Sequence, residues 1–505
     1  MAIASLLLLL LLLLLASYVA FVFVVSPTLV LRRLRRNGFT GPPPRFPLGN
    51  ILDMAKKENI KRDPSEDPLE VSHDIHSMVF PHFAQWRKLY GKVFIYWLGT
   101  EPFLYIADPE YLKAISSVVV TKNWGKPTVF RRDRQPMFGD GLVMVEGDRW
   151  VGNRHTITPL FSMTNLNAMI SSMVEITTTM LAEWTARASA TGTHETDVEP
   201  YIVRNAADII AMASFGVDDS AGKAAFDKFK ALQVALFSPN RLAGVPFGEY
   251  VQARRTAECR RLGEEIDRLL LSVIESRRRK SNGGEGEGED RIDLLGLLMR
   301  SGKGLTAREL VDECKTFFFA GHETTALAIT WTMFLLALHP EWQRQLREEV
   351  AEATGGGDID SVAMTWVMDE VLRLYPSAPN LLRQAREDIR VGDKTIIPHG
   401  TNIWIDAVGM HHDRSLWGDD VDEFRPERFK DSPYGGCTHR MGYVPFGYGG
   451  RVCVGKNLSV LEYKVVVSLI LKRFSLSLSP SYEHSPVVML TMRPSRGMPL
   501  ILETL

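Results

Sequence analysis

The chain has 505 residues, with 59 lysine and arginine residues against 60 aspartate and glutamate residues, so its formal net charge is −1. This balance gives no electrostatic reason to expect a nucleic-acid partner. Hydrophobic residues make up 45% of the chain and charged residues 24%, which excludes collagen-like, coiled-coil and wholly disordered proteins. The 4 cysteines form no C-x-x-C pair and no disulfide framework, and this usage favours a reducing compartment.

The first 25 residues predict a membrane anchor. They contain no charged residue and include an unbroken leucine run over residues 6–15. As a helix the segment would reach about 37 Å, which exceeds the ~30 Å core of a bilayer. A basic leader is missing and the apolar run is longer than in a cleaved signal peptide, so we expect residues 1–25 to remain attached. The arginines at 32, 33, 35 and 36 predict a single-pass protein whose remaining chain is cytosolic.

Residues 26–50 predict a basic stop followed by a proline-rich hinge. The prolines at 42, 43, 44 and 47 lack amide donors and fix φ, which predicts a stiff, extended connector. The rest, residues 51–505, is expected to form a single globular domain. Within it, the glycine-rich acidic stretch 281–290 (SNGGEGEGED) predicts a solvated loop.

The sequence of the globular body predicts a mainly helical fold with small sheets. The β-rich runs 93–98 and 103–106, separated by Gly-Thr-Glu-Pro, predict a hairpin. Apolar residues at three- and four-residue spacing then predict helices near 148–162, 165–187, 201–215, 222–237, 250–280, 305–338, 340–353, 361–375 and 456–474, with short strands around 386–391, 402–405 and 486–502. The chain has no G-x-G-x-x-G or G-x-x-x-x-G-K-[ST] motif, so electrons for any redox reaction must come from another protein.

The segment 446–455 carries the most specific chemistry. Its pattern F-x-x-G-x-R-x-C-x-G is formed by Phe446, Gly449, Arg451, Cys453 and Gly455 and precedes a predicted helix. We expect the positive end of that helix to lower the pKa of the cysteine and favour a thiolate metal ligand. The glycines let the backbone pass under a flat ligand, the arginine can pair with a carboxylate, and the phenylalanine can pack on an aromatic plane.

This pattern resembles the haem-thiolate signature of the cytochrome P450 monooxygenases, and the resemblance extends over almost the whole chain. It implies the cytochrome P450 fold, haem b as cofactor, Cys453 as the proximal iron ligand and O2 as co-substrate. It also implies that electrons come from NADPH through NADPH-cytochrome P450 reductase, and that the protein resides in the endoplasmic reticulum membrane. We expect the reductase to dock near Arg149, Arg440 and Lys456.

Three further motifs agree with the resemblance. The AGHETT segment lies in the predicted helix 305–338, and by the resemblance Glu323 and Thr324 form an acid–alcohol pair that delivers protons for dioxygen cleavage. A glycine next to threonines can open the helix there, although a packed polar patch is the alternative. Trp150 and Arg154 match a W-x-x-x-R motif that contacts one haem propionate, and Arg383 stands where a second propionate-binding arginine is expected. Each arginine could equally be a surface charge.

Structural residues of the family are also matched. The E-x-x-R pair Glu370 and Arg373, together with Arg428, implies a buried ionic triad under the cysteine loop. Two departures stand out: the segment between Val350 and Glu370 is shorter than usual, and Ser377 replaces the second proline of L-Y-P-P. The short segment could loosen the support of the triad.

Within the family the chain resembles the plant enzymes of clan 72, and among them family 715, in stretches such as SHDIHSMVFPHF and GKPTVFRRDRQPMFGDGLVMVEGDRW. Clan relatives oxidise gibberellins, brassinosteroids, cytokinins and terpenoids, which implies a lipophilic, medium-sized substrate. Residues expected to line its pocket are Phe130, Met137, Phe138, 237–247, 317–320, 378–382 and 487–490. Two alternatives remain open: a haem-thiolate isomerase or dehydratase that needs no reductase, and a haem-binding sensor or carrier without turnover.

Overall fold

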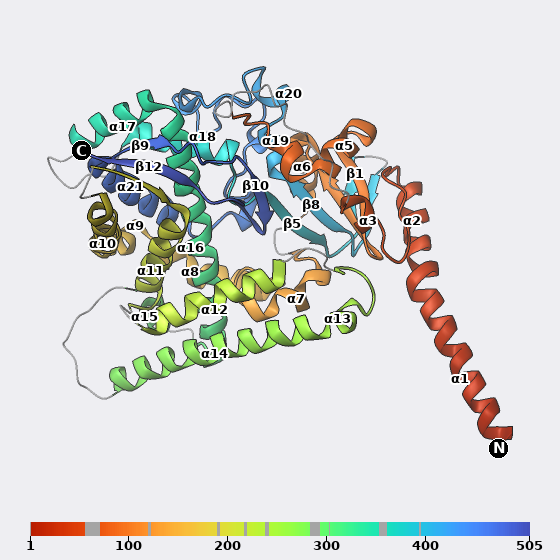
Figure 1. Ribbon diagram of the computed structural model, residues 1–505. Helices are drawn as coiled ribbons and strands as arrows, with labels where there is room; N and C mark the ends of the chain where they lie inside the picture. Colours follow the sequence, from red (N-terminus) through yellow and green to blue (C-terminus); the bar gives the residue numbers. More distant parts are fainter. Residues whose placement is uncertain are drawn as a thin grey trace.

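The N-terminal segment forms one long helix that projects from the body (Figure 1). The structure, a computed structural model, describes residues 2–55, 71–119, 123–188, 192–216, 220–237, 242–282, 293–301, 304–352, 361–392 and 395–505. The helix comprises α1 (Ala2–Ala20), the π-helical η1 (Phe21–Val25) and α2 (Ser26–Arg36). Its stretch Ile3–Arg36 is long and apolar enough to cross a membrane. The helix continues past residue 25 because Pro27 falls in the first turn of α2, where a proline is tolerated.

The connector after this helix is held against the first strand of the body. The Ile95 amide donates to the Thr40 carbonyl at 2.8 Å. Asn50 bonds Trp97 twice: its amide donates to the Trp97 carbonyl at 2.8 Å, and its side-chain oxygen accepts from the Trp97 amide at 3.0 Å. Helix α3 (Ile51–Met54) follows directly. The proline-rich stretch is therefore fixed to the sheet near both of its ends.

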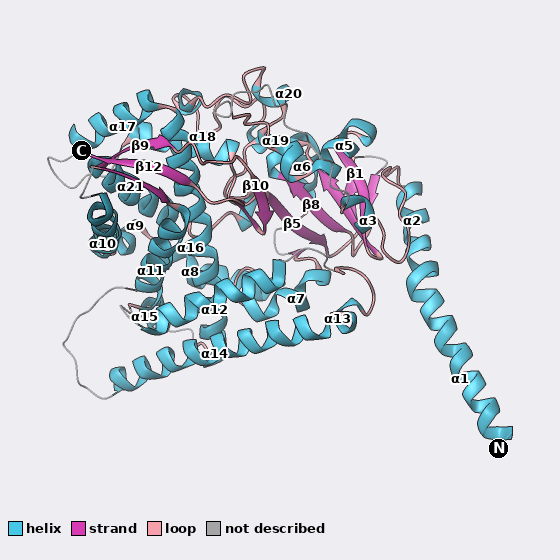
Figure 2. Cartoon of the chain, viewed as in Figure 1, coloured by secondary structure: helices cyan, strands magenta, loops and turns pink. Residues whose placement is uncertain are grey.

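The described residues form four small sheets, which lie beside the helices (Figure 2). The largest has the order β1-β2-β8-β5-β3, formed by β1 (Val93–Leu98), β2 (Glu101–Ile106), β8 (Asn402–Asp406), β5 (Asn380–Ala385) and β3 (Trp124–Gly125). β1 and β2 form the predicted hairpin. The other sheets are β4 (Thr193–Asp197) with β12 (Pro499–Thr504) and β9 (Phe474–Leu478), β10 (Pro486–Met489) with β11 (Thr491–Pro494), and β6 (Ile389–Val391) with β7 (Thr395–Ile397). The sequence did not indicate β4 or β5, because THETD and NLLRQA lack a clear apolar alternation.

Helices form most of the body, as predicted. The longer ones are α5 (Pro81–Tyr90), α6 (Pro109–Val118), α7 (Thr128–Phe138), α8 (Gly147–Ile157), α10 (Ile170–Ala188), α11 (Glu199–Phe215), α12 (Ser220–Phe237), α14 (Ala253–Asn282), α16 (Ala307–Leu338), α17 (Pro340–Glu352), α18 (Val362–Leu374) and α21 (Lys456–Arg473). The shorter ones are α4 (His76–Val79), α9 (Met163–Asn167), α13 (Gly248–Val251), α15 (Leu294–Arg300), α19 (Ala407–His411) and α20 (Arg414–Trp417). Helix α16 begins with a capping box formed by Thr306 and Glu309.

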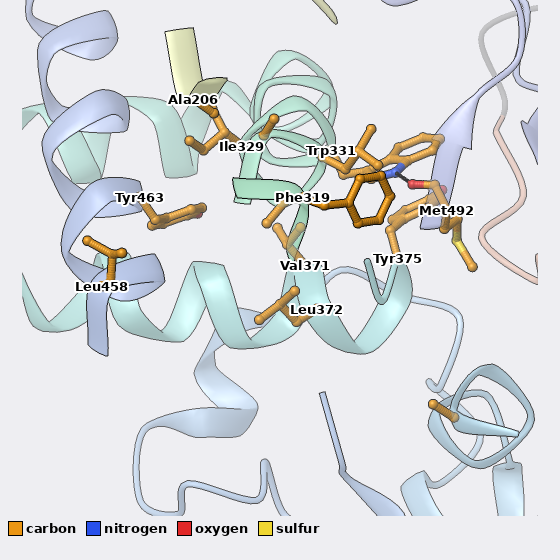
Figure 3. Close-up of a cluster of buried hydrophobic side chains, with 14 of the residues drawn as sticks. Ala206, Phe319, Ile329, Trp331, Val371, Leu372, Tyr375, Leu458, Tyr463 and Met492 are labelled. Atoms are coloured by element: carbon orange, nitrogen blue, oxygen red, sulfur yellow. Dashed lines mark hydrogen bonds between the residues drawn. The ribbon is translucent and has the colours of Figure 1, made fainter. Parts of the chain in front are cut away.

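The core around α16 fixes the helices that build the site. Trp331 of α16 donates its indole N–H to the Met492 carbonyl at 3.1 Å and stacks on Tyr375, with ring centroids 4.2 Å apart (Figure 3). Val371 of α18 and Tyr463 of α21 point into the same cluster. Three helices from distant parts of the chain therefore share one apolar core.

The predicted ionic triad is present and buried. Glu370 and Arg373 have no exposed side-chain surface, and their closest nitrogen–oxygen distance is 2.7 Å. Arg428 reaches the same carboxylate at 3.3 Å. The short segment before Glu370 includes residues 353–360, which lie outside the described residues, as does most of the acidic loop 281–290. Next to that segment, the Glu349 carboxylate accepts from the Val362 amide at 2.8 Å and thereby joins α17 to α18.

Candidate functional site

A cavity of about 320 Å³ separates the cysteine loop from helix α16. Cys453 follows the short 3-10 helix η7 (Gly449–Arg451) and exposes its sulfur to this cavity, while its amide donates to the Phe446 carbonyl at 2.8 Å. Gly321 and Thr324 of α16 also line the cavity. The arrangement leaves a space with a thiol on one element and a hydroxyl on another.

The pKa of Cys453 differs from the sequence-based expectation. Burial raises the pKa above its ordinary value, and this outweighs the Gly455 amide and the charges of Arg154 and Lys456, which lower it. Helix α21 begins at Lys456, and the amide of its N-cap residue, Gly455, is one of the groups that lower the pKa, but its effect is smaller than that of burial. The protein alone therefore favours the thiol, and a positively charged metal ion would be needed to favour the thiolate.

Most of the predicted site residues meet at this cavity. Those that line it are Trp150, Arg154, Thr324, Arg383, Phe446, Arg451, Cys453 and Gly455. Glu323 and Gly449 do not line it. Gly449 has φ +63°, a left-handed conformation that glycine adopts without strain, so it shapes the loop through its backbone.

The expected substrate pocket is only partly present at this cavity. Its walls include Phe317, Ala320, Ala378 and Leu381 from the predicted set. Phe130, Met137 and Phe138 are buried but do not line it. Phe138 packs edge-on against Phe319 of α16, with ring centroids 5.1 Å apart, so this aromatic side chain belongs to the interface of α7 with α16.

Positive charge gathers at one end of the cavity. Arg383, Arg451 and Lys126 line this end. Arg383 donates to the carbonyl of its own neighbour Leu382, at 2.9 Å. Arg451 donates to two backbone carbonyls, its guanidinium carbon lies 4.5 Å from the centre of the Trp150 ring, and its Nε has no partner. Among the described residues none of these three cations pairs with a carboxylate.

Two cations were not identified from the sequence: Lys126, which lines this end of the cavity, and Arg134, which acts on it electrostatically but does not line the cavity. Burial lowers the pKa of Lys126 well below its ordinary value, and the charges of Arg383, Arg134 and Arg451 lower it further. Arg134 of α7 is the second, and burial lowers its pKa to about 10. No motif marks either residue, because a lone lysine or arginine in a loop or helix is usually a surface charge.

Helix α16 brings hydroxyl groups to the cavity wall without unwinding. The Thr324 hydroxyl donates to the Ala320 carbonyl at 2.8 Å, and the Ser377 hydroxyl donates to the Thr324 carbonyl at 2.8 Å. The predicted opening of the helix at Gly321 is not present, since α16 is continuous. Glycine is needed there for another reason: an added Cβ would lie 2.6 Å from Ile210 of α11. The serine that replaces the usual proline therefore makes a specific contact with the predicted catalytic threonine.

Glu323 faces a second cavity, of about 100 Å³, together with Glu199, Gln233 and Arg493. The amide of Gln233 donates to both carboxylate oxygens of Glu323, at 2.6 and 2.7 Å. Arg493 of β11 lies 2.5 Å from Glu199 and 3.7 Å from Glu323. Burial lowers the pKa of Arg493, but the two carboxylates raise it more, so its pKa lies above the ordinary value. Burial raises the pKa of Glu199, which the arginine opposes.

Comparison with known proteins decides the family. Residues 69–500 match the family described as Cytochrome P450. The chain is a cytochrome P450. It is 36% identical to a cytokinin hydroxylase of Arabidopsis thaliana, over 96% of this chain and 94% of the relative. It is 34% identical to Cytochrome P450 734A1 of the same plant, over 95% and 92%, and 34% identical to Cytochrome P450 714C2 of Oryza sativa subsp. japonica, over 97% and 96%.

The family makes the protein a monooxygenase, an oxidoreductase, and implies a haem-thiolate centre. The residues of this P450 fit that group. A flat macrocycle with two carboxylates matches a cavity that has an exposed thiol, an unpaired arginine Nε on Arg451 and cations without carboxylate partners among the described residues. The matched relatives are plant proteins, which agrees with the predicted plant origin.

Proposed function

We propose that this P450 is a member of plant clan 72, family 715, that hydroxylates a lipophilic, hormone- or terpenoid-like molecule. Gibberellin-, brassinosteroid- and cytokinin-type compounds are candidates, since the relatives include a cytokinin hydroxylase. The observation that carries the proposal is the cavity shared by Cys453 and Thr324. Its remaining walls, which include Phe317, Ala320 and Leu381, are largely apolar and suit such a substrate.

In this proposal Cys453 holds the haem iron and Phe446 packs beside the macrocycle. Trp150, Arg154, Arg383 and Arg451 bind its carboxylates. Gly449 and Gly455 let the loop approach it. Bound haem b supplies the activation of O2 and the insertion of one oxygen atom into a C–H bond, with electrons from NADPH through its reductase.

We assign proton supply to Thr324 and Glu323. Thr324 presents its hydroxyl at the cavity wall, and Glu323 lies next to it in the chain but opens toward the smaller polar cavity. That cavity is large enough for water and is lined by Glu199 and Arg493. In this proposal water in the smaller cavity supplies protons to Glu323, and Thr324 holds a proton at the wall of the main cavity on the other side of α16.

The test compares Glu323→Gln and Thr324→Val with Thr324→Ser, which keeps the hydroxyl. General acid–base catalysis contributes about 10²–10⁴-fold. We expect both disruptive variants to consume NADPH with little product and to show a changed solvent isotope effect. In the serine variant, product formation per NADPH should stay close to that of wild type. Product formation per NADPH equal to wild type in Glu323→Gln would refute its role.

The proposal places the protein in the endoplasmic reticulum membrane through residues 1–25, followed by the basic stop and hinge 26–50 and the catalytic domain 51–505 in the cytosol. Arg149, Arg440 and Lys456 are exposed and offer positive charge for the reductase. Charge reversal of all three should lower the rate of haem reduction by the reductase but not by dithionite. An unchanged enzymatic rate would exclude this docking face.

The decisive first experiment is the reduced carbon monoxide difference spectrum of the protein in membranes, with Cys453→Ala as control. A strongly red-shifted Soret band that the variant lacks supports the thiolate assignment. Oxidation that depends on the reductase then separates the monooxygenase from the two alternatives, because an isomerase or dehydratase needs no reductase and a carrier turns nothing over.

A further inference from the structure

One buried carboxyl group on α16 is not used by the proposed mechanism. Glu313 lies in the second turn of this helix and is 3% exposed. One of its oxygens accepts from the Leu142 amide at 3.0 Å, and the other accepts from the side-chain amide of Asn153 at 2.7 Å. Leu142 precedes α8 and Asn153 is on α8. A single side chain therefore bonds α16 to two parts of the chain that lie 171 and 160 residues away.

Both partners of Glu313 are tied to the walls of the main cavity. Leu142 lines the cavity itself. Asn153 is next to Arg154 on α8 and almost one turn after Trp150, and both of those residues line the cavity. If α8 moved away from α16, the side chains to which we assign a haem carboxylate would move with it.

The segment that carries Leu142 packs directly on α16. An added Cβ at Gly139 would lie 1.9 Å from the Asp312 carboxylate, and one at Gly141 would lie 2.2 Å from the Thr316 hydroxyl. Glycine is needed at both positions because a side chain there has no room. The close contact shields the carboxyl group of Glu313 from water, so water reaches this group only when the segment moves away from the helix.

The surroundings of Glu313 favour its protonated form more than water does. Burial raises its pKa from the ordinary 4.5 to about 7, which outweighs the Leu142 amide and Asn153, and the nearby charges of Asp312 and Arg149 act in opposite directions. In the part of the chain that the structure describes, no cation forms an ion pair with Glu313. The titratable and charged groups around it, on α16, the segment before α8 and α8, are Asp312, Cys314, Asp140 and Arg149.

The sign of the pH dependence follows from this pKa. A carboxyl group that binds its proton more tightly when buried stabilises the closed arrangement fully below about pH 4.5. That stabilisation is lost as pH rises to about 7, where the ionised form leaves a charge buried without a counter-cation. Protonation keeps both hydrogen bonds available, because an asparagine side chain can present either its NH2 group or its oxygen to the acid.

We propose that Glu313 is a positioning residue of the haem site: protonated, it holds the Leu142 segment and α8 against α16, and ionised, it releases them. The inference rests on the proposed function, since Trp150 and Arg154, which it positions, are the haem contacts assigned there. Both forms are populated near neutral pH, so the site opens and closes without a change of ligand.

The experiment uses the haem-loaded full-length protein in detergent between pH 6 and pH 8. Hydrogen–deuterium exchange gives the protection factor of residues 139–154, and transfer of haem to apomyoglobin gives its rate of release. In wild type we expect protection to fall by about tenfold over this range and haem release to speed up in parallel. Glu313→Gln keeps two hydrogen bonds and cannot ionise, so both quantities should stay nearly constant with pH.

Glu264→Gln is the matched control, because this glutamate is exposed on α14 and its replacement should leave the pH dependence of wild type unchanged. Glu313→Ala removes both bonds and should show low protection at every pH. The same pH dependence in wild type and Glu313→Gln would overturn the inference, and so would a glutamine variant that is as unprotected as the alanine variant. An intact carbon monoxide band in the wild-type and glutamine samples shows that the proposed haem-thiolate site itself has not failed.

Discussion

Replacing Arg373 by lysine tests whether the buried triad supports the cysteine loop. The guanidinium makes five hydrogen bonds: two to Glu370 at 2.7 and 2.8 Å, and one each to the carbonyls of Val421, Glu423 and His411 at 2.6, 3.0 and 3.2 Å. A lysine ammonium has three donors, so at least two bonds are lost. Hydrogen bonds of charged groups contribute about 1.5–3 kcal/mol each, so the variant should lose roughly 3–6 kcal/mol of its free energy of unfolding.

The assay is chemical unfolding of the full-length protein in detergent, followed by circular dichroism and by loss of the thiolate-haem absorbance. Arg261→Lys is the control, because that arginine pairs with Glu258 and Glu265 on one helix face with 56% of its side chain exposed. Such surface pairs contribute about 0–1 kcal/mol. We argue that the buried network stabilises this region more than an exposed ion pair does. If Arg373→Lys and Arg261→Lys lower the free energy of unfolding equally, that argument is wrong.

Three further predictions concern single contacts. Thr306→Ala removes the capping box with Glu309 and should lower the free energy of unfolding by about 1 kcal/mol in the same assay. Gly139→Ala, at φ +53° with its new Cβ 1.9 Å from the Asp312 carboxylate, should cost about 2 kcal/mol or more and slow substrate binding by displacing α7, measured by unfolding and stopped flow. Burial raises the pKa of Asp406, but the charge of His76 and the hydrogen bonds from His76, Tyr105 and the Gly409 amide hold it below the ordinary value. The stability that this carboxylate contributes is therefore present above about pH 4 and is lost as pH falls further. Asp406→Asn should make the free energy of unfolding less dependent on pH in the acid range, measured by unfolding at a series of pH values.

Helices and site residues could be predicted where the pattern that defines them lies within one short segment of the chain. The helices over α14, α16, α18 and α21 agree with the expected ranges within about three residues, because apolar periodicity and caps define them. Cys453, Trp150 and Arg451 meet at one cavity as their motifs indicated. Each of those motifs is a short run whose spacing is fixed by one loop or one helix.

Contacts between distant segments could not be predicted in this way. Glu323 bonds Gln233, which is 90 residues away, and lies near Arg493 of β11, a strand that pairs with β10. No spacing rule connects such residues, since their proximity depends on how α12 and β11 pack on α16. The same holds for Lys126, which lines the cavity together with Arg383 and Arg451, residues more than 250 positions away in the chain.

Helix α16 acts as a partition between two compartments of different polarity. Successive residues open to opposite sides: Thr324 to the large apolar cavity and Glu323 to the small polar one. A bulky substrate can therefore fill its compartment without obstructing the supply of water and protons. It also means that the two compartments can change independently, so sequence variation in α12 or β11 can tune how efficiently reducing equivalents are used without altering which molecule is oxidised.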